Sequence, residues 1–172
     1  MTGEEVLFIL LKVLAVLVLL ALNGFFVAAE FALVKVRDTQ LQPLIAQGNR
    51  RARMAQHILH NLDAYLSAAQ LGITLASLAL GWIGEPIFEA LLHPVFGWLG
   101  WTGDEWERVR SGIAFAVGFS VITFLHIVAG EQAPKSLAIK RPLEGALWVA
   151  YPLRWFYVLA YPFIWVLNHS AL

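Results

Sequence analysis

The sequence predicts an all-α membrane protein with three transmembrane helices and juxtamembrane amphipathic helices that form a belt at the cytoplasmic side. Two features of the 172-residue chain indicate this class: 59% of its residues are hydrophobic and only 14% are charged. Soluble domains have roughly 45–50% apolar and about 25% charged residues, and one this small could not bury the excess. We therefore expect a single transmembrane domain over residues 1–172, in the inner membrane of the cell.

The predicted spans cover about residues 6–34, 64–84 and 111–133. The first starts with 24 residues, 6–29, in which Lys12 is the only charge. A helix of that length measures about 36 Å and crosses a bilayer core with some tilt. It is also longer than the apolar core of a signal peptide, which has about 7–15 residues. We expect Lys12 to extend its amine to the outer headgroups.

The charged residues between the spans predict the orientation of the chain. Basic residues gather in residues 35–63 and 135–141, whereas the predicted loop 85–110 is net acidic. Because basic segments stay in the cytoplasm, the N-terminus is expected outside and the C-terminus inside. Within the first basic segment, two short amphipathic helices are predicted over about 36–60, with a break near Gly48 and Asn49.

The C-terminal segment 146–167 is apolar and rich in aromatic residues, but Pro152, Arg154 and Pro162 interrupt it. Its longest uncharged stretch, 155–167, has 13 residues and is short for a span. Aromatic side chains also favour the membrane interface. We expect an interfacial helix here, and a fourth span is the alternative.

Polar residues within the spans are candidates for function, because lipid does not tolerate them without a partner. Asn23 lies deep in the first span, where it is a candidate for function or, alternatively, forms an interhelical hydrogen bond. Four polar residues of the second span follow the spacing of one helix face: Ser67, Gln70, Thr74 and Ser77. This face lines a hydrated cavity or, alternatively, its hydroxyls bond back to carbonyls of their own helix.

Glu131 lies at the inner end of the third span, shortly before Pro134. Proline lacks an N–H group and conflicts with the carbonyl four residues earlier, that of Gly130, so the helix should kink or open there. A freed carbonyl beside a carboxylate is typical of cation sites in transporters. The alternative is a plain helix end with a snorkelling glutamate. Glu30, at the end of the first span, is a lesser candidate that also fits an interfacial salt bridge.

The candidate ligands are all oxygen atoms, which suit Mg²⁺, Ca²⁺ or Na⁺. The chain has no cysteine and its histidines are scattered, with His57 and His60 the closest pair, so zinc is not expected. Zero net charge gives no reason to expect nucleic acid. Since no nucleophile–base pair or phosphate-binding loop is visible, we do not expect an enzyme.

Three segments resemble signatures of the CorC / cyclin M (CNNM) family, and they occur in the family's order: Leu22–Leu33, Tyr65–Leu75 and Gly130–Ser136. The resemblance implies a DUF21-type membrane domain that forms a homodimer among membrane lipids. It also implies Mg²⁺ export, coupled to Na⁺ influx. A non-transporting Mg²⁺ sensor, or a membrane anchor for cytoplasmic CBS domains, is the alternative function. The family's ATP-binding CBS pair and C-terminal CorC domain are expected only in a full-length protein, and residues 1–172 contain neither.

Under this resemblance, the ion is expected between the three spans. Many relatives carry serine near Ala28 or Ala29, where this chain has alanine, so the chain offers only a backbone carbonyl there. The expected ligands are the Glu131 carboxylate, the Gly130 and Ala28 carbonyls, the hydroxyls of Ser67, Thr74 and Ser77, and the side-chain oxygens of Gln70 and Asn23, of which the last two are candidates for either Mg²⁺ or Na⁺.

Overall fold

The computed structural model describes the backbone of residues 3–101 and 103–170, and all side chains there except those of residues 5–6, 84–91, 93–94, 104 and 167–170. The described backbone is helical, with no strand. Its elements in chain order are α1 (Gly3–Lys35), α2 (Asp38–Ala46), α3 (Arg50–Leu59), α4 (Leu62–Trp98), the 3-10 turn η1 (Asp104–Trp106), α5 (Glu107–Leu125), the π-helical segment η2 (His126–Gln132), α6 (Ala133–Lys140) and α7 (Pro142–Ser170).

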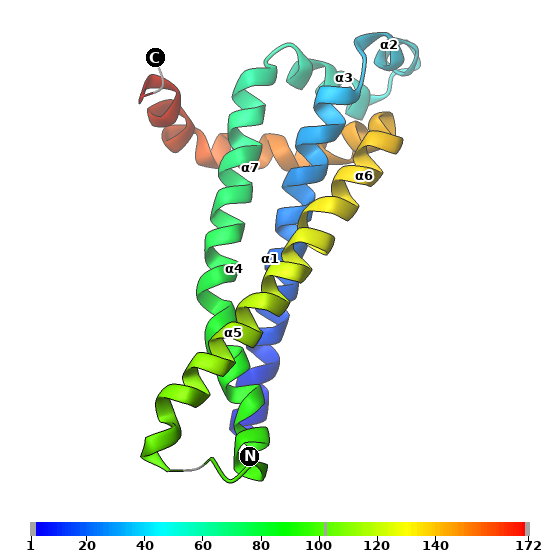
Figure 1. Cartoon of the computed structure of the whole chain (residues 1–172). Helices are drawn as coiled ribbons and strands as arrows, with labels where there is room; N and C mark the ends of the chain where they lie inside the picture. The colour runs from blue at the N-terminus through cyan, green and yellow to red at the C-terminus, as the bar shows by residue number, and fades with distance from the viewer. Residues whose placement is uncertain (1–2, 102, 171–172) are drawn as a thin grey trace.

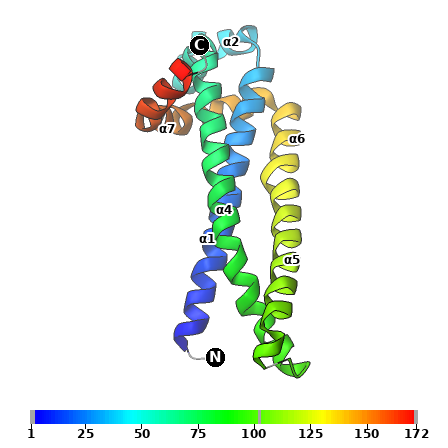
Figure 2. The same ribbon diagram turned by 60° about the vertical axis from the view of Figure 1, so that its left-hand side comes forward.

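Three long helical rods form the body of the molecule (Figures 1 and 2). They are α1, α4, and a continuous rod made of α5, η2 and α6. Within the described residues, three helical stretches are long and apolar enough to cross a membrane: Leu7–Lys35, Leu62–Ile83 and Glu107–Lys140. Many of their large apolar side chains are exposed, which is the expected state of a surface that faces lipid. The predicted all-α class with three spans is confirmed.

Helix α7 crosses the three rods near the end where α2 and α3 lie and does not run beside them (Figure 1). It is not among the three stretches of the described residues that are both long and apolar enough to cross a membrane, so the structure gives no support to a fourth span. Its position agrees with an in-plane helix. That α2, α3 and α7 form a cytoplasmic belt stays a prediction.

Helix α4 differs from expectation at its far end. Glu85 and Pro86 predict that the helix stops and a loop follows, but the backbone stays helical to Trp98. Apolar residues continue beyond the proline, and one of them, Phe96, is buried and stacks on Trp101. The tertiary packing of this segment therefore outweighs the local stop signal. The acidic side chains predicted to lie outside include some that fall outside the described side chains: Glu85, Glu89 and Asp104.

The break between α2 and α3 falls where the sequence predicts it. Gly48 adopts a φ of +82°, a conformation that only glycine reaches without strain. Asn49 then begins α3, and its side-chain oxygen accepts hydrogen bonds from the backbone N–H groups of Arg51 and Ala52. This N-cap fixes the start of α3.

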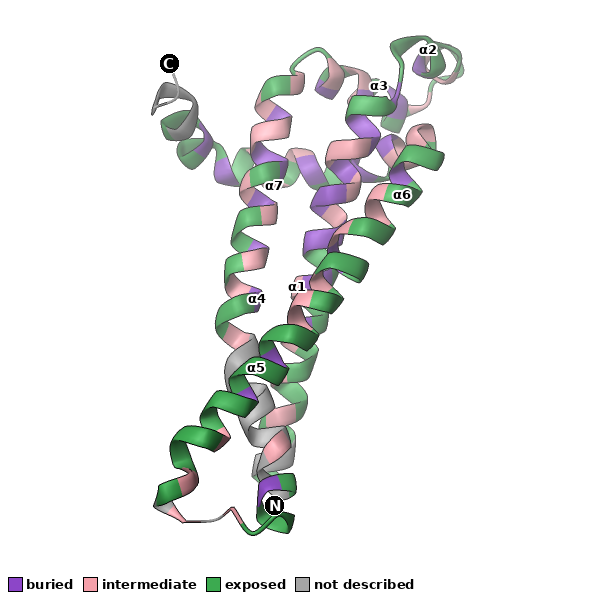
Figure 3. Ribbon diagram, in the orientation of Figure 1, coloured by how far each residue is buried: buried purple, intermediate pink, exposed green. Residues whose placement is uncertain are grey.

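The hydrophobic core lies at the end of the molecule where α1, α3, α4 and α7 meet (Figure 3). It is built largely from small and medium side chains, including Ala29, Leu33, Ala52, Tyr65 and Val149. The far halves of α1 and α5 carry mostly exposed apolar residues instead. One end of the bundle is therefore packed as in a soluble domain, while the other end relies on lipid to cover it.

Small residues allow α7 to approach α1 closely. Ala32 is fully buried, and a Cβ atom placed on Gly145 would lie 2.9 Å from the Ala32 Cβ. A methyl group of alanine has no rotamer by which to move aside, so any side chain at position 145 must push the two helices apart.

We predict that Gly145→Ala lowers the free energy of unfolding by about 1–3 kcal/mol, because it overpacks the contact between α1 and α7. Gly112→Ala is the matched control, since Gly112 is also helical but has no atom near its Cβ position. Thermal unfolding in detergent measures both. Equal melting temperatures for the two variants would contradict the close approach.

Candidate functional site

The rod formed by α5, η2 and α6 leaves the α-helical pattern over seven residues, His126–Gln132. In this π-helical segment the Ala133 N–H donates to the carbonyl of Val128, five residues earlier. Pro134 follows at the start of α6 and has no N–H to donate. The sequence predicts that the helix opens before Pro134, and the π-helical segment is the form that this opening takes. Such segments are frequent at functional sites.

A buried amide joins this segment to the first span. Asn23 of α1 is fully buried, and its Nδ2 donates a hydrogen bond to the Gly130 carbonyl over 3.0 Å. A Cβ on Gly130 would lie 3.1 Å from that nitrogen, and a Cβ on Gly24 would lie 2.9 Å from the Pro134 ring. Two glycines therefore let α1 and η2 pack closely enough for the amide to reach the carbonyl.

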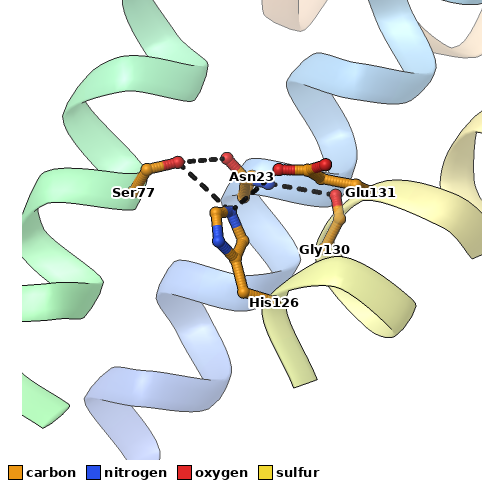
Figure 4. A network of polar contacts seen from close by, with 5 residues as sticks. All are labelled: Asn23, Ser77, His126, Gly130 and Glu131. Carbon is orange, nitrogen blue, oxygen red and sulfur yellow. Dashed lines mark hydrogen bonds and ion pairs between the residues drawn. The ribbon is translucent and has the colours of Figure 1, made fainter. Parts of the chain in front are cut away.

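Three further side chains extend this contact into a network between α1, α4 and η2 (Figure 4). The Ser77 hydroxyl on α4 donates to Oδ1 of Asn23 over 3.2 Å. The same hydroxyl lies 3.2 Å from Nε2 of His126, and that nitrogen lies 3.5 Å from a carboxylate oxygen of Glu131. The side chains of His126 and Glu131 are 21% and 44% exposed, so protein covers the Glu131 carboxylate only in part, although it lies within the membrane-length stretch Glu107–Lys140.

The Gly130 carbonyl fixes the direction of every hydrogen bond in the network. Since this carbonyl only accepts, the Asn23 amide turns its nitrogen to Gly130 and its oxygen to Ser77. Ser77 gives its single proton to that oxygen, so a lone pair of its hydroxyl faces His126. Nε2 of His126 must then carry the ring proton and donate to Ser77. The nearby carboxylate of Glu131, another acceptor, favours the same tautomer.

The structure brings four of the predicted site residues together: Asn23, Ser77, Gly130 and Glu131. It does not bring the rest of the polar stripe into the network. Ser67 donates to the carbonyl of Asp63, and Thr74 donates to the carbonyl of Gln70, as in the back-bonding alternative. The Gln70 side chain is exposed, and Ala28 lines a separate cavity of about 370 Å³ against α6 and α7.

His126 joins the network although the sequence analysis does not assign it to the site. It precedes Glu131 by five residues, a spacing that an α-helix does not place on one face. A π-helix bonds residues five apart, so there the two side chains come close. The combination of a histidine, a glutamate five residues later and a following proline is the signal that could have identified it.

The oxygen atoms of the network are of the kind that coordinates a hard cation. The network contains one carboxylate, one backbone carbonyl, one amide oxygen and one hydroxyl. The described residues contain no cluster of three or more His, Cys, Asp or Glu side chains that could hold a metal. A single carboxylate neutralises a divalent cation only in part, and such a site suits weak, exchangeable binding.

A cavity of about 260 Å³ reaches the network from between α4 and α5. Ser77 and His126 stand at one end of it, and Thr123 contributes a second hydroxyl. The remaining lining is apolar and belongs to the two helices: Leu80, Gly81, Phe115, Gly118, Phe119 and Ile122. The polar network therefore borders this cavity, which extends from it toward the loop between α4 and α5.

Comparison with known proteins decides the family. The family model of the cyclin M transmembrane N-terminal domain matches residues 14–172, nearly the whole chain. The chain belongs to the cyclin M family. Curated relatives include two Bacillus subtilis proteins, UPF0053 protein YhdT and UPF0053 protein YugS. They are 53% and 48% identical to the chain over 154 and 163 residues, which is 90% and 95% of its length. The Mycobacterium tuberculosis protein Rv1841c is 35% identical over 163 residues.

These relatives are longer than the chain. The matched region covers 32% of YhdT, 37% of YugS and 45% of Rv1841c, so the chain spans about a third to a half of their length. The family assignment therefore concerns the membrane domain.

We predict that Asn23→Ala lowers the free energy of unfolding by about 1–3 kcal/mol, because it leaves the Gly130 carbonyl without its donor and the Ser77 hydroxyl without its acceptor. Asn61→Ala is the control, since the Asn61 side chain is exposed and donates to the carbonyl of His57 at the surface. It should change stability by less than about 0.5 kcal/mol. If both variants unfold alike in detergent, the network does not hold α1 to η2.

Proposed function

We propose that this cyclin M membrane domain exports Mg²⁺ across the inner membrane, coupled to Na⁺ influx. One observation carries the proposal: the Glu131 carboxylate reaches the Asn23–Ser77 network from a π-helical opening in a membrane-length rod. An ionisable group at such a depth is costly unless it serves a partner or an ion. Among the described residues, the basic side chain within ion-pair distance of Glu131 is His126, at 3.5 Å, and a histidine is charged only when protonated.

In this proposal the ion binds between α1, α4 and η2. The Glu131 carboxylate is the charged ligand, and the Gly130 carbonyl and the oxygens of Asn23 and Ser77 are neutral ligands. Mg²⁺ dehydrates reluctantly and normally keeps several waters, so a few protein oxygens suffice. We assign Ser67, Gln70 and Thr74 to the cytoplasmic approach, because they lie on α4 on the side of Ser77 that faces α3. Ala28 is not among the proposed ligands.

Release follows from the same chemistry. Na⁺ also prefers hard oxygen ligands, so it competes for the site when it arrives from outside. The π-helical segment is a place where the third rod can change its hydrogen-bond register, which would open the site to one side and then to the other. The proposal includes a homodimer in the membrane lipid, with the N-terminus outside and the C-terminus in the cytoplasm.

The direct test is Glu131→Gln, which keeps the shape of the side chain and removes its charge. We expect it to abolish both the Mg²⁺-dependent rise in melting temperature and Mg²⁺ flux from loaded liposomes. Glu144→Gln is the control, since this carboxylate is exposed and pairs with Arg141 at the start of α7. It should leave both signals unchanged.

The outcomes separate the functions. An unchanged melting shift in Glu131→Gln removes this residue from the ion site. If the parent protein binds Mg²⁺ but carries no flux, the exporter proposal fails and the sensor or anchor function takes its place.

A further inference from the structure

We propose that His126 is an internal competitor for the cation site and sets its affinity. This inference rests on the proposed function, because it concerns the same Glu131 site. The Nε2–H group of His126 lies against two oxygens that the ion would use, the Ser77 hydroxyl and the Glu131 carboxylate. In the ion-free protein the imidazole therefore stands where part of the cation's ligand shell would be.

The hydrogen bonds of the network determine where the ring proton of His126 lies. The hydrogen-bond chain that ends on the Gly130 carbonyl requires Nε2 of His126 to donate. A neutral imidazole with its proton on Nε2 has no lone pair on that nitrogen and cannot ligate a metal through it. In this tautomer His126 presents the positive end of an N–H dipole to Glu131 and would repel a cation placed between them.

An arriving ion must displace the N–H group of His126 from the oxygens of Ser77 and Glu131. Nε2 lies 3.2 Å from the Ser77 hydroxyl, a hydrogen-bond distance, and 3.5 Å from the Glu131 carboxylate, an ion-pair contact, so both oxygens lie close to the same nitrogen. Both contacts are longer than a strong hydrogen bond. The His126 N–H group therefore holds the Ser77 and Glu131 oxygens in place without binding them tightly, and a cation can replace it.

A displaced His126 ring has space beside it. His126 lines the cavity of about 260 Å³ between α4 and α5, and its side chain is partly exposed. Thr123 lines the same cavity, one helical turn earlier on the same rod, and offers a hydroxyl to a displaced imidazole. The ring thus has both room and a polar partner on the side away from Glu131.

The functional consequence is a lower affinity and an easier release. When the ion leaves, the N–H group returns to Ser77 and Glu131, so the carboxylate is not left without a partner at membrane depth. A transported ion must be released in every cycle, and an internal donor that takes its place lowers the cost of the empty state.

The test compares His126→Phe with His126→Gln in the full chain. Phenylalanine keeps a ring and removes the donor, so Mg²⁺ should bind roughly five- to tenfold more tightly, the effect of one lost hydrogen bond on the competing state. Glutamine keeps an amide N–H and should return the affinity toward that of the parent. His60→Phe, at an exposed position after α3, is the control and should bind like the parent. Calorimetry with Mg²⁺ alone measures the dissociation constants.

A structural role alone does not tighten binding, so an increase in affinity is specific to competition. Unchanged or weaker binding by a folded His126→Phe protein overturns the proposal, and weaker binding identifies His126 as a ligand instead. If that variant does not fold, ¹⁵N NMR of the parent decides: the Nε2–H signal of His126 should shift on Mg²⁺ addition, and a constant signal refutes the idea. If the parent binds no Mg²⁺, the proposed function itself fails and this inference with it.

Discussion

A single buried amide connects the first membrane helix to the point where the third rod leaves the α-helical register. Asn23 satisfies the Gly130 carbonyl, and that carbonyl is accessible because the π-helical segment opens before Pro134. Unpaired backbone groups are costly in lipid, so the opening is stable only with a donor from another helix. The arrangement of Ser77, His126 and Glu131 depends on this hydrogen bond, because it fixes which atom of each side chain donates.

The sequence predicts the scaffold well because lipid imposes strong and simple constraints. Uncharged runs of membrane length identify the three spans, and Gly48 with Asn49 marks the break between α2 and α3. Pro134 predicts the disturbance of the third span, since its steric effect on the preceding turn is local. The grouping of Asn23, Ser77, Gly130 and Glu131 follows from the tendency of polar residues in a membrane to form hydrogen bonds with one another across helices.

Other features depend on packing and could not be predicted from local patterns. The extension of α4 to Trp98 reflects contacts such as that of Phe96 with Trp101, which no stop signal at Glu85–Pro86 reveals. Aligned polar residues predict a shared face, but Ser67 and Thr74 turn back to their own helix, a choice of rotamer that spacing does not encode. The role of His126 requires the π-helical register, which changes the residues that share a face.

We propose that Glu131 holds a divalent cation between α1, α4 and η2. A crystal structure of the protein with Mn²⁺, an oxygen-preferring ion with a measurable anomalous signal, tests it most directly. We expect an anomalous peak about 2.0–2.2 Å from the Glu131 carboxylate, with the Nε2 atom of His126 turned away from it. A peak at other acidic residues of the chain, with the Glu131 network unchanged, would contradict it.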